Sequence, residues 1–252
     1  MDVDAYLARI GYTGAREPRA DVLAELHRAH MLAVPFENLD IHLGVENVLD
    51  YDHVFDKIVT RRRGGWCYEL NGLFALLLEA LGFHVTRYSA SVVLSEPPSP
   101  DFAHLTLRVD LDRPWLADVG FGASFTTPLC FEDEDDQERD GKRYRLARAA
   151  DGRMVLHEDD APQYAFALEP RRMEEFAEMC ARQQTEPGSH FLQAPMCTRA
   201  TEAGRETLSG MRLITTTPAG RSERELGGED ERMAVLRDVF GVDLGRARFR
   251  AL

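Results

Sequence analysis

The sequence predicts an α+β protein, because two hydrophobic periodicities occupy separate parts of the chain. In the first third, apolar residues recur at helical spacing, and from Phe83 onward the repeat shortens to that of strands with one buried face. The final part combines a predicted hairpin with a last helix. With 252 residues, the chain is long enough to bury a substantial core in two or three closely packed lobes.

Three helices are predicted in the first third. The first is capped by Asp21 and the second by Asp52. The third has the clearest pattern, with apolar residues at i, i+3, i+4 and i+7 from Leu70 to Leu81. Gly82 follows directly, in the position where glycine commonly ends a helix.

The middle third is predicted to be a mostly antiparallel β unit. Apolar and polar residues alternate over 103–111, which indicates a half-buried strand, and a second strand is expected over 115–121. Two Asp-Gly pairs further on are typical of hairpin turns. The remaining expected elements are a connecting helix over 171–184, a hairpin over 206–217 and a final helix over 229–240.

The composition argues against several classes of function. A net charge of −13 disfavours nonspecific binding to nucleic acid or to anionic membranes. We find no long apolar run that would span a bilayer and no N-terminal secretion signal, so no membrane partner is expected. The four cysteines, at positions 67, 130, 180 and 197, show no paired spacing, which predicts reduced thiols in a cytoplasmic protein.

Three further patterns are interpreted as structural. The acidic run at 132–136 is typical of a solvated loop. His27 and His30 share a helix, but no third ligand follows in pattern, so no metal site is expected. The Gly-Phe-Gly segment at 120–122 lacks the third glycine of a dinucleotide-binding fingerprint and predicts a tight turn.

Cys67 is the most distinctive residue of the chain, because it follows a glycine pair and opens an apolar helical run. Free backbone N–H groups and the positive end of the helix dipole meet at a helix N-terminus, and both favour a thiolate. We therefore expect Cys67 to be a nucleophile. Since a single cysteine in an apolar helix is more often a small core residue, this interpretation requires a base nearby.

His104 and Asp118 are the candidates for that base and for the carboxylate that orients it. Asp118 lies in an otherwise apolar strand, where an unpaired carboxylate would be costly to bury. If the hairpin between the two strands centres near Leu111, residues whose numbers sum to 222 face each other, as His104 and Asp118 do. Such neighbours have Cβ atoms about 5 Å apart. A slip of one residue would place them on opposite faces of the sheet.

Four separated blocks of the sequence resemble the arylamine N-acetyltransferase family. Residues 63–71 read R-G-G-W-C-Y-E-L-N and match the family signature R-G-G-x-C-x-E-x-N. Residues 35–40, P-F-E-N-L-D, are similar to the family segment P-F-E-N-L. H-L-T-L at 104–107 and D-V-G-F-G at 118–122 match the histidine strand and the turn of the family. The likeness is clear over about the first half of the chain and looser beyond it.

The resemblance implies an architecture of three parts. These are a helical bundle over 1–83, an antiparallel β-barrel-like domain over 84–185 and a smaller α/β lid over 186–252. The first two parts would then be similar in shape to cysteine proteases and transglutaminases.

The resemblance also implies roles for individual residues. Cys67, His104 and Asp118 would form a catalytic triad, and Arg63 would pair with Glu37 to support the active-site loop. Five positions match residues that shape an aromatic acceptor pocket, approach coenzyme A or border it from the lid: Phe36, Phe121, Gly122, Phe125 and Phe191.

The activity that the resemblance implies is ping-pong acyl transfer. Cys67 would take an acetyl group from acetyl-coenzyme A and pass it to the nitrogen of a small aromatic amine or hydrazine. Acetyl-coenzyme A would be a cosubstrate, with no permanently bound cofactor. The alternative within the family is an amide synthase that closes a macrolactam from a polyketide chain on an acyl carrier protein. The four blocks disfavour a thiol protease or amidase and a non-enzymatic binding module.

Overall fold

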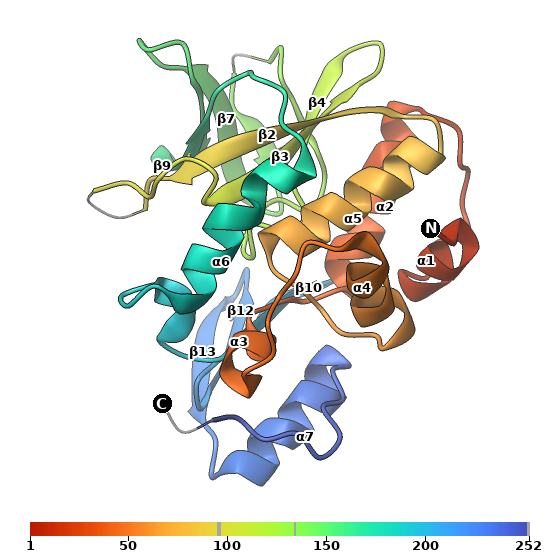
Figure 1. Cartoon of the computed structure of the whole chain (residues 1–252). Coiled ribbons are helices and arrows are strands. Elements are labelled where there is room, and N and C mark those ends of the chain that lie inside the picture. The colour runs from red at the N-terminus through yellow and green to blue at the C-terminus, as the bar shows by residue number, and fades with distance from the viewer. Residues whose placement is uncertain (95–96, 134, 251–252) are drawn as a thin grey trace.

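The computed structural model describes residues 1–94, 97–133 and 135–250, and it has the α+β architecture that the sequence predicts. The N-terminal helices pack beside an eight-stranded antiparallel sheet, and a separate five-stranded sheet lies toward the last helix (Figure 1). Among the described residues, no helix is long and apolar enough to cross a membrane.

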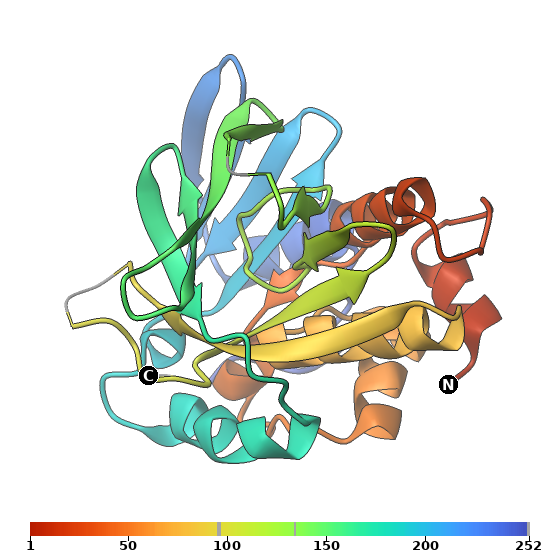
Figure 2. The ribbon, with the colours of Figure 1, turned by 90° about the horizontal axis from the view of Figure 1, so that it is seen from above.

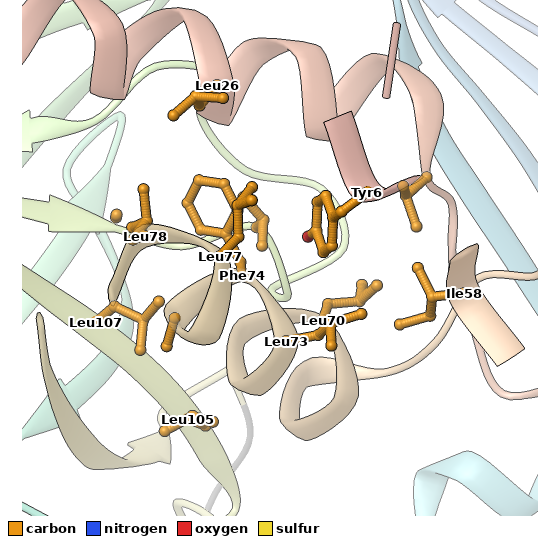
Figure 3. Packing of buried hydrophobic residues seen from close by; sticks show 14 of the residues in the cluster. Tyr6, Leu26, Ile58, Leu70, Leu73, Phe74, Leu77, Leu78, Leu105 and Leu107 are labelled. Atoms are coloured by element: carbon orange, nitrogen blue, oxygen red, sulfur yellow. The ribbon is translucent and has the colours of Figure 1, made fainter. Parts of the chain in front are cut away.

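The N-terminal part is mainly helical. Its elements are α1 (Val3–Arg9), α2 (Ala20–Ala33), the short strand β1 (Phe36–Glu37), α3 (Leu39–Leu43), α4 (Tyr51–Phe55), a π-helical segment (Asp56–Thr60) and α5 (Cys67–Ala80). Eleven of the fourteen residues of α5 are buried, so other elements must cover this helix on nearly all sides. Figure 3 shows α2 above it and β3 below it, with Leu26, Leu73 and Leu107 among the contacting side chains.

The eight-stranded sheet has the order β5-β4-β3-β2-β9-β8-β7-β6, and every pairing in it is antiparallel. The two edge strands, β5 and β6, nearly meet. The Gln137 side chain of β6 donates to the Cys130 carbonyl of β5 and accepts from the Cys130 N–H. Figure 2 shows β2 lying along α5. The strands are β2 (His84–Val92), β3 (His104–Asp110), β4 (Pro114–Ala117), β5 (Leu129–Cys130), β6 (Gln137–Arg139), β7 (Lys142–Arg148), β8 (Met154–Glu158) and β9 (Ala161–Phe166).

The five-stranded sheet joins the two ends of the chain. Its order is β1-β10-β11-β12-β13, so that Phe36 pairs with Thr198 and Glu37 with Cys197. Its other strands are β10 (Met196–Thr201), β11 (Gly204–Ser209), β12 (Arg212–Thr217) and β13 (Gly220–Glu225), and the last helix is α7 (Glu229–Phe240). The chain reaches this sheet through a 3₁₀ turn (Met173–Phe176), α6 (Ala177–Thr185) and a second 3₁₀ turn (His190–Leu192).

The division at residues 83/84 and 185/186 stays a prediction. Phe176 and Cys180, which the prediction assigns to the β domain, are buried in the same apolar cluster as α5. The barrel has a core of its own, to which Leu116, Leu156 and Phe166 belong.

Most sequence-based elements agree with the structure, but both predicted helix caps are wrong. Helix α2 begins at Ala20, and Asp21 lies in its first turn, where it pairs with Arg19. The carboxylate that caps α4 is Asp50, which accepts the His53 N–H, and not Asp52. Each predicted cap lies two residues after the observed one, in the first turn of its helix, where acidic residues are also favoured by the helix dipole.

The second predicted strand is too long. Strand β4 ends at Ala117, and its pairing with β3 matches Leu107 to Ala117, so paired residue numbers sum to 224 and not to 222. The acidic run at 132–136 forms a loop with exposed ends, as predicted, although Glu134 lies outside the described residues.

Replacing Leu77 by Ala should test the contribution of the α5 core. Leu77 is fully buried, so we expect the loss of methyl groups and the cavity left behind to lower the free energy of unfolding by about 2–5 kcal/mol. Urea denaturation would measure it. Leu94→Ala is the control, because that side chain is 62% exposed and its replacement should cost less than about 0.5 kcal/mol. Equal midpoints for the two variants would contradict the prediction.

Candidate active site

Cys67 is the first residue of α5, as the sequence predicts. The preceding residue, Trp66, is extended and serves as the N-cap, and its N–H donates to the Glu69 carboxylate at 3.2 Å. The side chain of Glu69, which lies in the first turn of the helix, thereby fixes the backbone at the helix start. The position of the Cys67 side chain is therefore set by the helix start and not by a flexible loop.

The residues just before Cys67 are held against β1. The Glu37 N–H donates to the Gly65 carbonyl at 2.8 Å, and the Gly65 N–H donates to the Pro35 carbonyl at 3.3 Å. A Cβ atom on Gly64 would lie 2.1 Å from the Pro35 carbonyl oxygen, so glycine is required there for close approach. This contact explains why the blocks at 35–40 and 63–71 occur together.

Arg63 and Glu37 form the ion pair that the resemblance implies. The guanidinium donates to both carboxylate oxygens of Glu37, at 2.7 and 2.9 Å, and also to Asp40 at 2.7 Å. Glu37 in turn accepts the N–H groups of Gly64 and Leu39. These paired charges are buried and fix the loop that leads to Cys67.

Lys57 extends this cluster, and the sequence analysis did not assign it a role. Its ammonium is 1% exposed and lies 2.8 Å from Asp40 and 2.9 Å from Glu69. It also donates to Asn47 at 3.1 Å. The sequence did offer one signal of its burial, because Lys57 directly precedes the apolar residues Ile58 and Val59 in a helical pattern. The buried cluster therefore connects the π-helical segment with the first turn of α5.

His104 and Asp118 are joined by a hydrogen bond of 2.6 Å from Nε2 to Oδ2. Both side chains are buried, with exposed fractions of 2% and 0%. A carboxylate of the usual charge can only accept, so Nε2 carries the proton in this bond. Nδ1 is then the nitrogen of the neutral ring that is able to accept a proton.

The two residues meet although their register differs from the predicted one. His104 begins β3, whereas Asp118 follows the end of β4, and they are not opposite each other. The difference of two residues preserves the face of the sheet, because side chains alternate with a period of two. A diagonal neighbour on the same face remains within reach of an imidazole ring.

Asp118 accepts three further hydrogen bonds through its carboxylate. Tyr164 of β9 donates to Oδ2 at 2.9 Å, and Oδ1 accepts from Asn71 at 2.8 Å and from the Gly120 N–H at 3.0 Å. Burial would raise the pKa of Asp118, but interaction with His104 and these hydrogen bonds outweigh it and hold the pKa below its usual range. Asp118 is therefore an anion at neutral pH.

Asn71 and Tyr164 were not identified from the sequence. Asn71 lies one turn after Cys67 on α5, which was a usable signal, and it ties this helix to the Leu105 carbonyl and the Val119 N–H. Tyr164 lies 46 residues from Asp118, and no local pattern connects them.

The thiol of Cys67 lies beside the start of β3. Its Sγ is 4.0 Å from the carbonyl oxygen of Ala103, the residue before His104. Burial raises the pKa of Cys67 well above its usual range, although hydrogen bonds from the Leu105 and Tyr68 backbone act in the opposite direction. This is the reverse of the shift expected from the helix N-terminus alone, because Cys67 is only 3% exposed.

Three of the expected pocket residues lie near this site. The Phe121 ring packs edge-on against His104, with centroids 5.1 Å apart. Gly122 has a φ of +83°, which favours glycine, and a Cβ there would lie 3.8 Å from the Phe36 ring.

Phe191 approaches from the segment before β10. Its ring packs edge-on against Trp66 at 5.3 Å and lies 6.4 Å from Phe36. The Phe191 carbonyl accepts a hydrogen bond of 2.9 Å from Asn38 and lies 3.0 Å from Nε2 of His42. The 35–40 block therefore also holds the segment that carries Phe191.

Phe125 lies in a different environment. It is fully buried in the barrel core, where it stacks on His27 at 5.7 Å and meets Tyr144 edge-on at 5.4 Å. Its expected place in an acceptor pocket stays a prediction.

Comparisons with known proteins agree on one family. A family model described as N-acetyltransferase matches residues 20–249. The arylamine N-acetyltransferase of Mycolicibacterium smegmatis is 34% identical over 256 residues, covering 97% of this chain and 93% of the relative. The solved structure of Mycobacterium marinum arylamine N-acetyltransferase in complex with CoA has a TM-score of 0.88 at 35% identity, covering 96% of this chain and 93% of that chain. The structure of the Salmonella typhimurium arylamine N-acetyltransferase has a TM-score of 0.89 at 30% identity, covering 98% and 94%.

These matches, together with the fold, define an acetyltransferase enzyme. The chain belongs to the arylamine N-acetyltransferase family.

Replacing Lys57 by Met should show how much the buried ion cluster depends on its central cation. We expect the free energy of unfolding to fall by about 3–5 kcal/mol at neutral pH, because Asp40 and Glu69 would lose a buried partner. Burial raises the pKa of Glu69 above its unfolded value, and Lys57 acts against this rise, so the pKa should rise further in the variant. The unpaired Glu69 charge then opposes folding above that pKa, and this cost disappears as the pH falls. The loss should therefore shrink toward acidic pH.

Arg61→Met is the matched control for Lys57→Met. Arg61 pairs with Asp56 in the same segment, but both side chains are about half exposed, so its loss should cost less than about 1 kcal/mol. Chemical denaturation across pH would measure both variants. A loss for Lys57→Met that is no greater than the loss for Arg61→Met would contradict the dependence of the buried cluster on its central cation.

Proposed function

We propose that this protein transfers an acetyl group from acetyl-coenzyme A to an arylamine or arylhydrazine through an acetyl-Cys67 intermediate. The single observation that carries this proposal is the 2.6 Å bond between His104 and Asp118. The helix-starting Cys67 lies close to this pair along the fold, because its Sγ is 4.0 Å from the carbonyl oxygen of Ala103, the residue before His104. The family membership supports acetyl transfer, and the complex of the M. marinum relative with CoA supports acetyl-coenzyme A as the donor. Acetyl-coenzyme A acts as a cosubstrate and not as a bound cofactor.

In the first half-reaction, Nδ1 of His104 accepts the thiol proton as Cys67 attacks the thioester carbonyl carbon. General-base help is needed because burial raises the pKa of the thiol. The ionised Asp118 stabilises the imidazolium that forms. Free N–H groups in the first turn of α5 stabilise the oxyanion of the tetrahedral intermediate. The C–S bond to coenzyme A then breaks, and its sulfur takes the proton from His104.

In the second half-reaction, the amine nitrogen attacks the carbonyl carbon of acetyl-Cys67. His104 removes a proton from the nitrogen, the bond between carbon and Sγ breaks, and the thiol recovers its proton. The amide product leaves and the enzyme returns to its first state. The two substrates therefore act in turn, which is ping-pong kinetics.

Aromatic side chains next to His104 and Trp66 favour an aromatic acceptor. Phe121 packs on His104, and Phe191 packs on Trp66, with its ring 6.4 Å from the Phe36 ring. Both Phe121 and Phe191 are partly exposed, so their rings are available to a planar acceptor. Gly122 allows coenzyme A to approach the backbone closely at this turn.

The alternative of an amide synthase has less support, because the relatives named above are arylamine N-acetyltransferases. All four cysteines are free thiols, which supports a reducing location such as the cytoplasm.

The decisive experiment is intact mass spectrometry after exposure to acetyl-coenzyme A without an amine. We expect the mass of one acetyl group on the wild-type protein, release of one equivalent of coenzyme A, and loss of the acetyl group when an arylamine is added. Cys67→Ala should take up no acetyl group, whereas Cys130→Ala, which also removes a buried thiol, should behave as wild type. Normal labelling of Cys67→Ala would contradict the nucleophile. Labelling only by a carrier-bound acyl chain would favour the amide synthase.

A further inference from the structure

We infer that His27 is a positioning residue that holds the backbone of Asp118 and thereby fixes the carboxylate that orients His104. His27 belongs to α2, a helix that contributes none of the three residues of the proposed triad. The inference deepens the proposed function and rests on it, because it concerns the geometry of the same site.

Both ring nitrogens of His27 are used. Nδ1 lies 2.8 Å from the Thr126 carbonyl oxygen, and Nε2 lies 3.1 Å from the Asp118 backbone nitrogen. A backbone N–H can only donate, so Nε2 is unprotonated and accepts. The proton is therefore on Nδ1, which donates to Thr126. The two bonds together define one tautomer of a neutral ring.

The ring has little freedom to move. It stacks on Phe125 with an interplanar angle of 19° and meets Phe74 edge-on at 5.9 Å. Thr126, the other anchor, is itself fixed, because its N–H and its hydroxyl both donate to Asp140. His27 therefore places its Nε2 lone pair at a defined point behind Asp118.

The surroundings also keep His27 neutral. Burial lowers its pKa to about 4, although the hydrogen bond to Thr126 and the charges of Asp118 and Asp140 act in the opposite direction. His30, one turn further along α2, is equally buried. A neutral ring is the form that accepts the Asp118 N–H.

This bond satisfies the backbone N–H of Asp118. The carboxylate accepts from His104, Tyr164, Asn71 and the Gly120 N–H, but a backbone N–H needs an acceptor of its own. Asp118 is fully buried, and an N–H without an acceptor there would be costly.

Loss of the acceptor would affect the site through the peptide between Ala117 and Asp118. This peptide would rotate or admit water, and either change moves Oδ2 relative to His104. Displacements of about 1 Å at a catalytic group cost up to about 100-fold in rate.

His30 provides a matched control for His27. It lies three residues further along α2, is equally buried, and packs edge-on against the same Phe74 at 5.5 Å. Its Nδ1 is hydrogen-bonded at 2.8 Å to Tyr6 of α1 and not to the Asp118 segment. Replacing either histidine by leucine removes a buried ring. His27 loses two hydrogen bonds and His30 loses one, but only the replacement of His27 affects Asp118.

The main experiment compares His27→Leu, His27→Gln and His30→Leu by the rate of acetylation of Cys67 in a single turnover with acetyl-coenzyme A. We expect His27→Leu to lower this rate by about 10- to 100-fold and to displace its pH profile. His27→Gln, which keeps a donor and an acceptor, should recover much of the rate. His30→Leu should lose stability but keep the wild-type rate and pH profile. Equal rates for His27→Leu and His30→Leu would overturn the inference.

A double-mutant cycle tests whether His27 acts through Asp118. In an Asp118→Asn background, adding His27→Leu should change the rate little, because the carboxylate that His27 positions is gone. Full additivity of the two effects would overturn the inference.

Two measurements keep this inference separable from the proposed function. If wild-type Cys67 takes no acetyl group from acetyl-coenzyme A, the proposed function fails. The rate at which iodoacetamide alkylates Cys67 would then replace the acetylation rate in the comparison of the same three variants. Nitrogen NMR of the wild-type protein should show His27 as the Nδ1–H tautomer at neutral pH. An Nε2–H tautomer would overturn the inference without any variant.

Discussion

The rest of the site depends on the burial of one charge, the carboxylate of Asp118. An ion without solvent is tolerated only where hydrogen bonds and an opposite charge replace the lost water. Asp118 obtains these from β3, β9, α5 and the turn that follows it, and its backbone N–H is taken by α2. Five separate parts of the chain must therefore be in place before the carboxylate is stable. The same requirement brings the proposed base and the helix of the proposed nucleophile together.

A second buried cluster, made of ion pairs, fixes the backbone that precedes Cys67. Arg63 and Lys57 form ion pairs with Glu37, Asp40 and Glu69, and the cluster joins β1, α3, the π-helical segment and α5. Burying charges in this way adds little to stability compared with apolar packing, but it strongly penalises any arrangement in which one partner is displaced. We interpret the cluster as a device that fixes the backbone before the thiol. Cys67 thus lies between two networks, one for its backbone and one for its base.

The pairing of β3 and β4 shows both the power and the limit of sequence reasoning. Alternation of apolar and polar residues placed His104 and Asp118 on one face correctly, because the side-chain period of a strand is fixed by backbone geometry. The register was wrong by two residues, since the length of the connecting turn sets it and the pattern is unchanged by such a shift. A related limit applies to Cys67: the helix N-terminus, which favours a thiolate, is visible in the sequence, whereas the burial that raises its pKa is not.

The sequence by itself determined the fold class, the helix that begins at Cys67, and the family, because periodicity and short motifs are local properties of the chain. It also indicated the pair Arg63 and Glu37, through the family motifs at 63–71 and 35–40. Only the tertiary structure decided that Lys57, Tyr164 and His27 belong around the site. These residues contact partners 12, 46 and 91 positions away along the chain, and hydrogen bonds over such separations leave no periodic signal. Their roles follow from burial, which requires every enclosed polar group to find a partner wherever the fold brings one near.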